Sequence, residues 1–288
     1  MAGLLPGGRP LDDPRARAEV ASSWGIAEQS LPSSRGPLTT EAILREAAAG
    51  RLHGLLIGGL ELDDLPDPRA AAAAVAAAGF VVSLEQRPSV VTDLADVVLP
   101  VASVAEKSGS FASWEGRVRV FPQVLREALT VADGAVLGMI ADELGWTGGR
   151  WDSAALRREL DGFGPWSGAR AAAASTNATH ADAARQPAGE QWTLVAHRLL
   201  IDAGALQTGE PHLAATARPT QAVVAVGSAR GTTATVTGPN GSLTLPVVEG
   251  DVLPGAVWLP LHSAGCRVYA DLGARPGDTV TITWGGSR

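Results

Sequence analysis

Charged residues gather in one short segment, Glu106 to Arg117, of this 288-residue chain. Glu106 and Lys107 stand at its start, and Glu115 and Arg117 stand at its end. Guanidinium and ammonium groups bind phosphate oxygens, so this segment could contact a phosphorylated ligand. Both signs of charge occur in the same loop, however, and opposite charges at this spacing can neutralise each other. The residues favour ion pairs that hold the loop, with a ligand contact as the alternative.

Two glycines, Gly58 and Gly59, end a short apolar run and could let the backbone approach a phosphate group. A dinucleotide-binding fingerprint needs the pattern G-x-G-x-x-G with a helix directly after it, and this stretch has neither. A tight turn is therefore the favoured interpretation of these glycines.

The sequence gives little support for a metal site, an iron–sulfur cluster or a catalytic nucleophile. The single cysteine, Cys266, excludes a disulfide within the chain and is too few for a four-cysteine iron–sulfur cluster. The five histidines show none of the spacings of a zinc site. Arg267 could lower the pKa of the neighbouring thiol, but a lone cysteine near a turn is more often inert. No Ser/His/Asp or Cys/His grouping is visible, so we assign no catalytic residue.

Charge and hydropathy exclude two further classes. The net charge is −7, and no basic stripe with interleaved aromatic residues is present, which disfavours nucleic-acid binding. The least charged runs are alanine-rich and fall short of the roughly 20 apolar residues that a bilayer crossing needs. The first residues lack the charged start and apolar core of a secretory signal, so we expect a cytoplasmic location.

Short apolar runs alternate with helical patterns between residues 40 and 100. Asp67 is a candidate N-cap with Pro68 at the first helical position, and Gly79 is the expected end of that helix. The pattern predicts strands at 52–59, 80–84 and 97–100 and helices at 40–49, 68–79 and 89–95. Such alternation predicts an α/β fold with a doubly wound, mainly parallel sheet.

The chain then changes character twice. After the loop at 106–117, the pattern predicts an extended piece at 118–121 and helices at 132–144 and 153–160. Residues 167–190 have no sustained apolar periodicity and are typical of a linker. Strands are expected from Trp192 onward, at 192–196, 222–226, 232–237, 242–248, 256–259 and 279–284. Asn240-Gly241 predicts a tight hairpin with positive φ, and the set predicts a small closed or half-open β-barrel.

Several motifs carry a family resemblance. They are ADVVLP at 95–100, Glu106-Lys107 followed by Gly109, EGR at 115–117, and VLPGAVWLP at 252–260. In this order and spacing they resemble the signature of the molybdopterin oxidoreductase superfamily. Within it, WEGR at 114–117, the PGGRP opening and Asp271-Leu272-Gly273 are most similar to the large iron-sulfur subunit of bacterial NADH-quinone oxidoreductase, respiratory complex I.

The resemblance implies a vestigial pterin site. Its candidate residues are Gly58, Gly59, Glu85, Thr92, Glu106, Gly109, Ser110 and Arg117. Relatives that bind the cofactor commonly have Glu-Thr where this chain has Val90-Val91, and Thr and Asn where it has Ser110 and Ser113. The barrel also lacks a turn motif that usually follows its first long strand. We therefore expect no cofactor or metal on this chain, with a vestigial molybdopterin site as the alternative.

These expectations combine into one hypothesis. Residues 1–166 would form a molybdopterin-oxidoreductase-like domain that is incomplete at its N-terminus, 167–190 a linker, and 191–288 a molybdopterin-dinucleotide-binding-like barrel. The resemblance implies a non-catalytic, C-terminal scaffold module that binds the cluster-bearing part of the same large iron-sulfur protein, at the inner face of the membrane. The alternatives are a fragment that binds molybdopterin guanine dinucleotide, and a decayed gene piece without a partner.

Overall fold

The computed structural model describes residues 4–32, 39–113, 115, 117–126, 129–146, 152–170 and 191–286. The chain forms two compact units. The first comprises Met1–Gly59, Ala78–Pro88 and Ala95–Asn177, and the second comprises Leu60–Ala77, Ser89–Leu94 and Ala178–Arg288. Residues 60–77 and 89–94, which we expected in the first domain, thus group with the barrel. Residues 171–190 of the expected linker lie outside the described residues.

The first unit begins with a small cluster of N-terminal elements. Strands β1 (Leu4–Leu5) and β2 (Arg9–Pro10) pair with each other before helix α1 (Pro14–Trp24). The Asp13 side chain caps α1 by accepting a hydrogen bond from the Ala16 amide at 3.0 Å. Helix α6 (Ser153–Gly162) leads into Phe163, which packs against the buried core of this cluster.

A parallel sheet forms the centre of the first unit. It follows helix α2 (Thr40–Ala48), and its strands β3 (Leu55–Gly58), β4 (Val81–Glu85) and β5 (Val97–Pro100) lie in chain order. Helix α5 (Asp133–Glu143) packs against one face of this sheet, where Val136 joins the same buried cluster as Leu84 and Val101. The predicted parallel strands are therefore confirmed. A doubly wound sheet would also need strands that reverse this order.

An antiparallel hairpin replaces most of the loop expected at 106–117. Strand β6 (Gly109–Ala112) pairs with β7 (Val118–Phe121), so the extended piece at 118–121 is confirmed but its partner strand was missed. The Phe121 ring lies over Gly109, where a Cβ atom would come within 2.7 Å of it, and stacks on Phe111 at 4.9 Å between centroids. This cross-strand aromatic packing explains why residues 109–112 form a strand.

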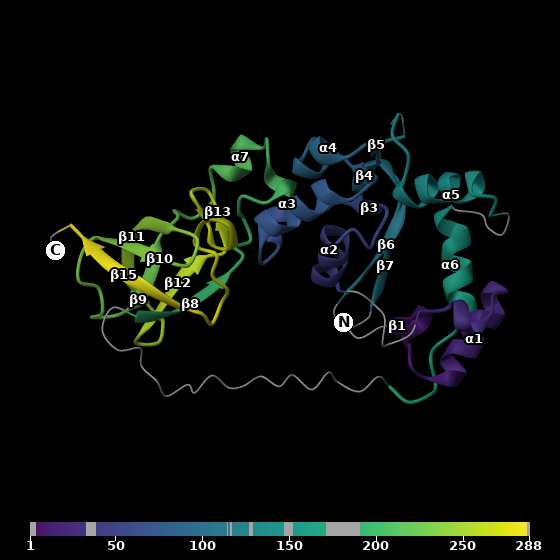
Figure 1. The fold of residues 1–288 in the computed structure, drawn as a ribbon, viewed down its shortest axis with the longest axis horizontal. Helices are drawn as coiled ribbons and strands as arrows, with labels where there is room; N and C mark the ends of the chain where they lie inside the picture. Colours follow the sequence, from purple (N-terminus) through teal and green to yellow (C-terminus); the bar gives the residue numbers. More distant parts are fainter. Residues whose placement is uncertain are drawn as a thin grey trace. The chain divides into compact units, whose positions relative to one another are not determined.

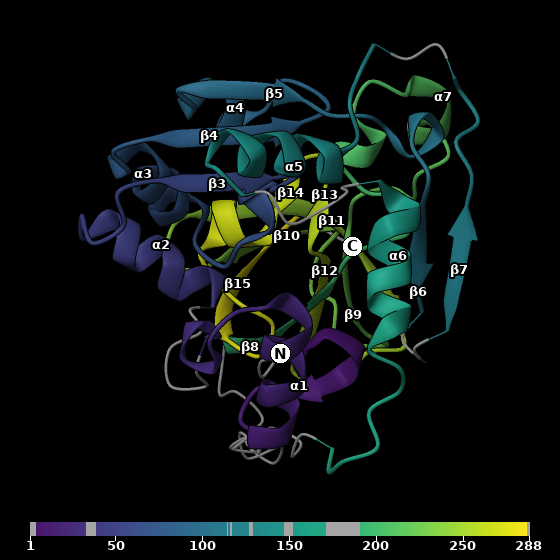
Figure 2. The same ribbon diagram turned by 90° about the vertical axis from the view of Figure 1, so that its right-hand side faces the viewer.

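The second unit is built around a closed six-stranded barrel (Figures 1 and 2). Its strand order is β10-β11-β9-β12-β8-β15. The strands are β8 (Gln191–His197), β9 (Ala222–Ala225), β10 (Thr233–Thr237), β11 (Ser242–Gly250), β12 (Ala256–Pro260) and β15 (Thr279–Gly285). Leu194, Leu259 and Ile282 are fully buried inside it. The predicted barrel strands are confirmed, and the barrel is closed.

Shorter elements complete this unit. The turn Leu62–Asp64 precedes α3 (Pro68–Ala77), and α4 (Val90–Leu94) and α7 (Pro211–Ala214) are short helices. β13 (His262–Ser263), β14 (Cys266–Arg267) and the π-helix Val268–Leu272 connect β12 to β15. Asp67 caps α3 as predicted, because its Oδ1 accepts a hydrogen bond from the Ala70 amide at 2.9 Å.

The hairpin between β10 and β11 forms for a different reason from the one predicted. Its loop spans residues 238–241, and neither Asn240 nor Gly241 has positive φ. The loop instead packs on the backbone of the π-helix, where the Asn240 amide donates to the Leu272 carbonyl at 2.9 Å. A Cβ atom on Gly238 would overlap that same carbonyl oxygen. Close approach to Leu272, not a left-handed turn, shapes this loop.

Candidate functional site

Three of the expected site residues lie at the carboxyl edge of the parallel sheet. Gly58 ends β3 and Glu85 ends β4, and Gly59 follows in a left-handed conformation with φ of 59°. The Gly59 amide donates to the Leu84 carbonyl at 3.2 Å, so the glycine pair forms a turn that extends the strand pairing. The Glu85 carboxylate accepts from the amide of Gln86 at 2.9 Å. At this edge of the sheet, the chain forms a turn whose hydrogen bonds are made within the turn and to the neighbouring strand.

Thr92 belongs to the second unit and serves its own helix. Its hydroxyl donates to the Ser89 carbonyl at 2.8 Å and accepts from the Ser89 amide at 2.7 Å, which closes the turn that begins α4. Val91, which stands where relatives of the superfamily commonly have a polar residue, is buried, and Val90 is exposed. Neither valine can donate or accept a side-chain hydrogen bond. The pair that the resemblance associates with pterin binding is therefore absent here.

Glu106 completes a capping box. Its carboxylate accepts from the Ser103 amide at 2.9 Å and from the Thr130 hydroxyl at 3.2 Å. The hydrogen bond from the Ser103 backbone is the largest reason that the pKa of Glu106 lies below its ordinary value. This carboxylate holds the loop that leads to β6.

The other charged residues of this segment form ion pairs. Arg117 pairs with Glu115 at 2.9 Å, in line with the interpretation of the segment as internally neutralised. Lys107 instead pairs with Asp133, at the start of α5 and 26 residues away. Both pairs stabilise local structure.

The remaining candidates of the segment lie in the β6–β7 hairpin. Gly109 lies beneath the Phe121 ring, and Ser110 is exposed opposite Val120. Of the eight candidates, Gly58, Gly59 and Glu85 are brought together, while Glu106, Gly109, Ser110 and Arg117 each lie in the loop or hairpin that follows β5. The geometry gives each polar group among them a local structural role or leaves it exposed.

A charged network in the second unit was missed by the sequence analysis. Asp64 accepts from Arg198 at 2.6 Å and lies 3.3 Å from the ring nitrogen of the buried His262. Asp63 accepts from Arg267 at 3.1 Å, and Arg267 also pairs with Asp271. The acidic turn is visible in the sequence, but its partners lie more than 130 residues away, and no local pattern could identify them.

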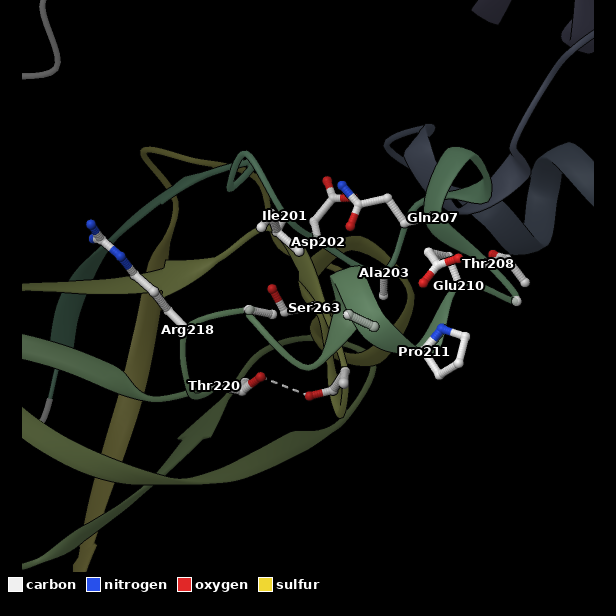
Figure 3. A pocket seen from close by; sticks show the side chains of 14 residues that line it. Ile201, Asp202, Ala203, Gln207, Thr208, Glu210, Pro211, Arg218, Thr220 and Ser263 are labelled. Atoms are coloured by element: carbon white, nitrogen blue, oxygen red, sulfur yellow. Dashed lines mark hydrogen bonds between the residues drawn. The ribbon is translucent and has the colours of Figure 1, made fainter.

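The barrel also carries an open cavity of about 450 Å³ (Figure 3). Its polar side chains mostly bind the protein itself: Glu210 accepts from the His212 amide at 2.9 Å, and Thr220 donates to the Ala264 carbonyl at 2.8 Å. Asp202 at its edge pairs with Arg198 at 2.7 Å. The Arg218 side chain extends away from the other labelled residues. Most of the polar groups that line this cavity are therefore engaged in contacts within the protein.

Metal sites and membrane-spanning helices are both absent from the residues that the structure describes. These residues contain no group of three or more His, Cys, Asp or Glu side chains arranged to hold a metal ion. Within the same residues, no helix has both the length and the apolar character for a bilayer crossing.

Comparison with known proteins gives a consistent set of relatives. The G subunit of NADH-quinone oxidoreductase from Streptomyces coelicolor is 45% identical over 293 residues, which is 98% of this chain and 34% of that protein. The G subunit from Mycobacterium bovis is 44% identical over 288 residues, 97% of this chain and 35% of that protein. The chain is homologous to these G subunits. It corresponds to a C-terminal portion, about a third of the length of these relatives.

More distant similarities extend to two other proteins. A nitrate reductase of Symbiobacterium thermophilum is 34% identical over 123 residues, 41% of this chain and 16% of that protein. Acetylene hydratase from Pelobacter acetylenicus is structurally similar with a TM-score of 0.46 and 14% identity, over 83% of this chain and 42% of that protein. No protein-family model matches this chain.

Proposed function

We propose that this chain is a non-catalytic scaffold module of NADH-quinone oxidoreductase, which supports electron transfer from NADH to quinone without a redox centre of its own. The similarity to the G subunits of that enzyme over nearly the whole chain carries this proposal. It would contribute a binding surface for other parts of the complex and would stabilise the assembled complex. As a component of a multi-subunit oxidoreductase, it acts through its contacts.

The residues do not fit a bound pterin. A pterin dinucleotide needs side chains free to donate to and accept from its ring system and phosphates. Glu106 is used in a capping box, Lys107 and Arg117 are used in ion pairs, and Val90 and Val91 replace the polar pair. These interactions support the proposal of a scaffold that retains the fold of the superfamily without binding its cofactor.

In the assembled enzyme, this chain would complete a larger fold and bind neighbouring subunits. The three-stranded sheet would become part of a doubly wound sheet with the remainder of the G subunit. The barrel would keep the form of a dinucleotide-binding domain, after a linker at 167–190. The partners would be other subunits of the complex, foremost the cluster-bearing part of the G subunit, on the cytoplasmic face of the membrane.

Metal and pterin analysis tests this function directly. The complex is purified with this chain in place, and bound molybdenum and released guanine nucleotide are quantified per chain. We expect neither, while NADH-quinone activity is normal. In a strain whose G subunit lacks this region, we expect less assembled complex but unchanged turnover per assembled complex. Stoichiometric molybdenum or guanine would overturn the scaffold role.

A second candidate is a molybdopterin-dependent oxidoreductase fragment. The ADVVLP and EGR motifs and the partial similarity to a nitrate reductase favour it. This function requires affinity for molybdopterin guanine dinucleotide, so a calorimetric titration of the purified chain with guanine dinucleotide distinguishes the two. Heat of specific binding supports the second candidate, and its absence supports the scaffold.

A further inference from the structure

The β6–β7 hairpin exposes apolar side chains to solvent. Ser110 lies opposite Val120 and Ala112 opposite Val118, so these four residues share one face of the hairpin. All four are exposed, and the Val120 side chain is 75% exposed. Phe111 lies on the other face and is 60% exposed although it stacks on Phe121. Both faces thus present apolar side chains.

The apolar surface continues into the segment after β7. Val124 and Leu125 are also exposed, and their amides both donate to the Ala105 carbonyl, at 2.9 and 2.8 Å. These bonds fix the backbone of the segment next to the hairpin. We call Phe111, Val118, Val120, Val124 and Leu125 the hairpin surface.

The hairpin also has free edges. Among the described residues, β6 and β7 form a sheet of their own with two strands. A two-stranded hairpin is marginally stable by itself, and its outer edge presents unpaired amides and carbonyls that another strand can bind. The unpaired edge and the apolar faces are together suited to a partner that adds a strand to this hairpin.

The positive charges beside the hairpin surface indicate which charge the partner should carry. Arg119 lies in β7 and Arg126 directly follows the apolar segment, and both are exposed. In the part of the chain that the structure describes, neither takes part in an ion pair, whereas Arg117 nearby is paired with Glu115. A partner with carboxylates around an apolar strand would complement both arginines.

We propose that the hairpin surface binds an apolar, acid-rimmed strand from the part of the G subunit that lies outside this chain. This inference rests on the proposed function. The length of the related G subunits indicates why the binding partner would be another part of the same protein. The chain spans only about a third of their length, so most of the G subunit has no counterpart in it. A strand added to the hairpin would cover Val120 and Leu125 and pair the free edge.

The test uses a defined partner. The full chain is co-expressed with the tagged remainder of the Streptomyces coelicolor G subunit, whose matching third is 45% identical to it. Co-purification and affinity are then measured for the wild type, Val120→Asp, Leu125→Asp and Arg119→Glu. We expect the wild type to bind and each aspartate variant to bind at least about tenfold more weakly, because a buried unpaired carboxylate is costly. Arg119→Glu should weaken binding and reduce its dependence on salt.

The control is Val226→Asp, a substitution at a side chain that is 79% exposed in the barrel unit. It should leave the affinity unchanged, and circular dichroism should show that all variants are folded. Equal binding by wild type and Val120→Asp overturns the inference and leaves the proposed function standing. If the wild type itself fails to bind, the proposed function is overturned as well. Self-association of the wild type that Val120→Asp abolishes would identify a second copy as the occupant and overturn the inference.

Discussion

The Arg198 guanidinium donates to the Asp64 carboxylate at 2.6 Å and so connects residues 134 positions apart. Arg198 follows strand β8 of the barrel, and Asp64 ends the short turn before helix α3. His262 lies beside the same carboxylate at 3.3 Å. Through these contacts, the segment from Leu62 to α3 is attached to the barrel, in agreement with its place in the second unit.

Asp64→Ala should loosen this attachment. Asp64 is 36% exposed, so we expect a loss of about 1 kcal/mol, at the upper end for a partly exposed ion pair. That loss corresponds to a decrease in Tm of roughly 2–4 °C for a domain of this size. Thermal unfolding measures the change, and Asp251→Ala, at an exposed position of the same unit, is the control. Equal effects of both substitutions would contradict the proposed attachment.

Asp202 should make the stability depend on pH in the acid range. Burial opposes its charge, but hydrogen bonds from Arg198 and the Gly204 amide outweigh that effect and lower its pKa. The unfolded chain, with a pKa of about 3.9, therefore takes up the proton first as the pH falls. The stabilisation is present above the unfolded pKa and is lost as the pH falls through the folded pKa.

Urea unfolding of the wild type and Asp202→Asn measures this contribution. The wild type should be more stable by a constant amount above about pH 5, and the difference should shrink towards about pH 3. A difference that stays constant over the whole range would show that Asp202 gains nothing from its charge in the folded chain.

The thiol of Cys266 should be unreactive in the folded protein. Burial and, to a smaller extent, the charge of Asp271 raise its pKa to about 12. This agrees with the favoured expectation of an inert thiol, whereas the alternative that Arg267 lowers the pKa is wrong, because the effect of burial dominates. The Arg267 guanidinium pairs with Asp63 and Asp271. A thiol reagent at about pH 8 should modify the chain only after unfolding in guanidinium. Rapid modification of the native protein would contradict the burial of this side chain.

Local patterns predicted elements well where a single stretch of residues determines them. The cap of α3 by Asp67 and the alternation of β10 depend on neighbouring residues, and both are confirmed. Strand β6 was missed because Gly109 and Ser110 have low strand propensity, and the strand depends on Phe121 across the hairpin.

The candidate site was less predictable for a related reason. A charged side chain in the sequence shows its type but not its partner. Lys107 was expected to pair within its loop, yet its partner Asp133 lies on α5. The pair of Asp64 and Arg198 is separated even further, and only the folded barrel brings the two together.

Gly238→Ala should destabilise the barrel. The added Cβ would overlap the Leu272 carbonyl oxygen, which belongs to the backbone and cannot rotate away. We expect a loss of about 1–3 kcal/mol, as for other overpacked sites, measured by urea unfolding. Gly162→Ala is the control, because a Cβ there meets nothing within 4 Å, and alanine should slightly stabilise the end of α6. Equal stability of the wild type and Gly238→Ala would show that the loop can shift away from Leu272 at no cost, and would contradict this prediction.

Arg9 should be the main anchor of the N-terminal elements of the first unit. Its side chain is 5% exposed, donates to the Phe163 carbonyl at 2.6 Å and pairs with Glu19 at 2.9 Å. The guanidinium carbon also lies 5.3 Å from the centre of the Phe163 ring. Lysine keeps the charge but not the planar fork of donors, so Arg9→Lys should cost about 1.5–3 kcal/mol.

Arg15→Lys is the matched control for Arg9→Lys, because Arg15 pairs with the same Glu19 at 3.0 Å but is 64% exposed. We expect the control to change stability by less than about 0.5 kcal/mol, as surface substitutions usually do. Hydrogen exchange should show faster opening of α1 in Arg9→Lys alone, because Arg9 ties the N-terminal strands to the carbonyls after α6. Similar exchange in both variants would mean that the apolar cluster around Val20, not Arg9, holds these elements together.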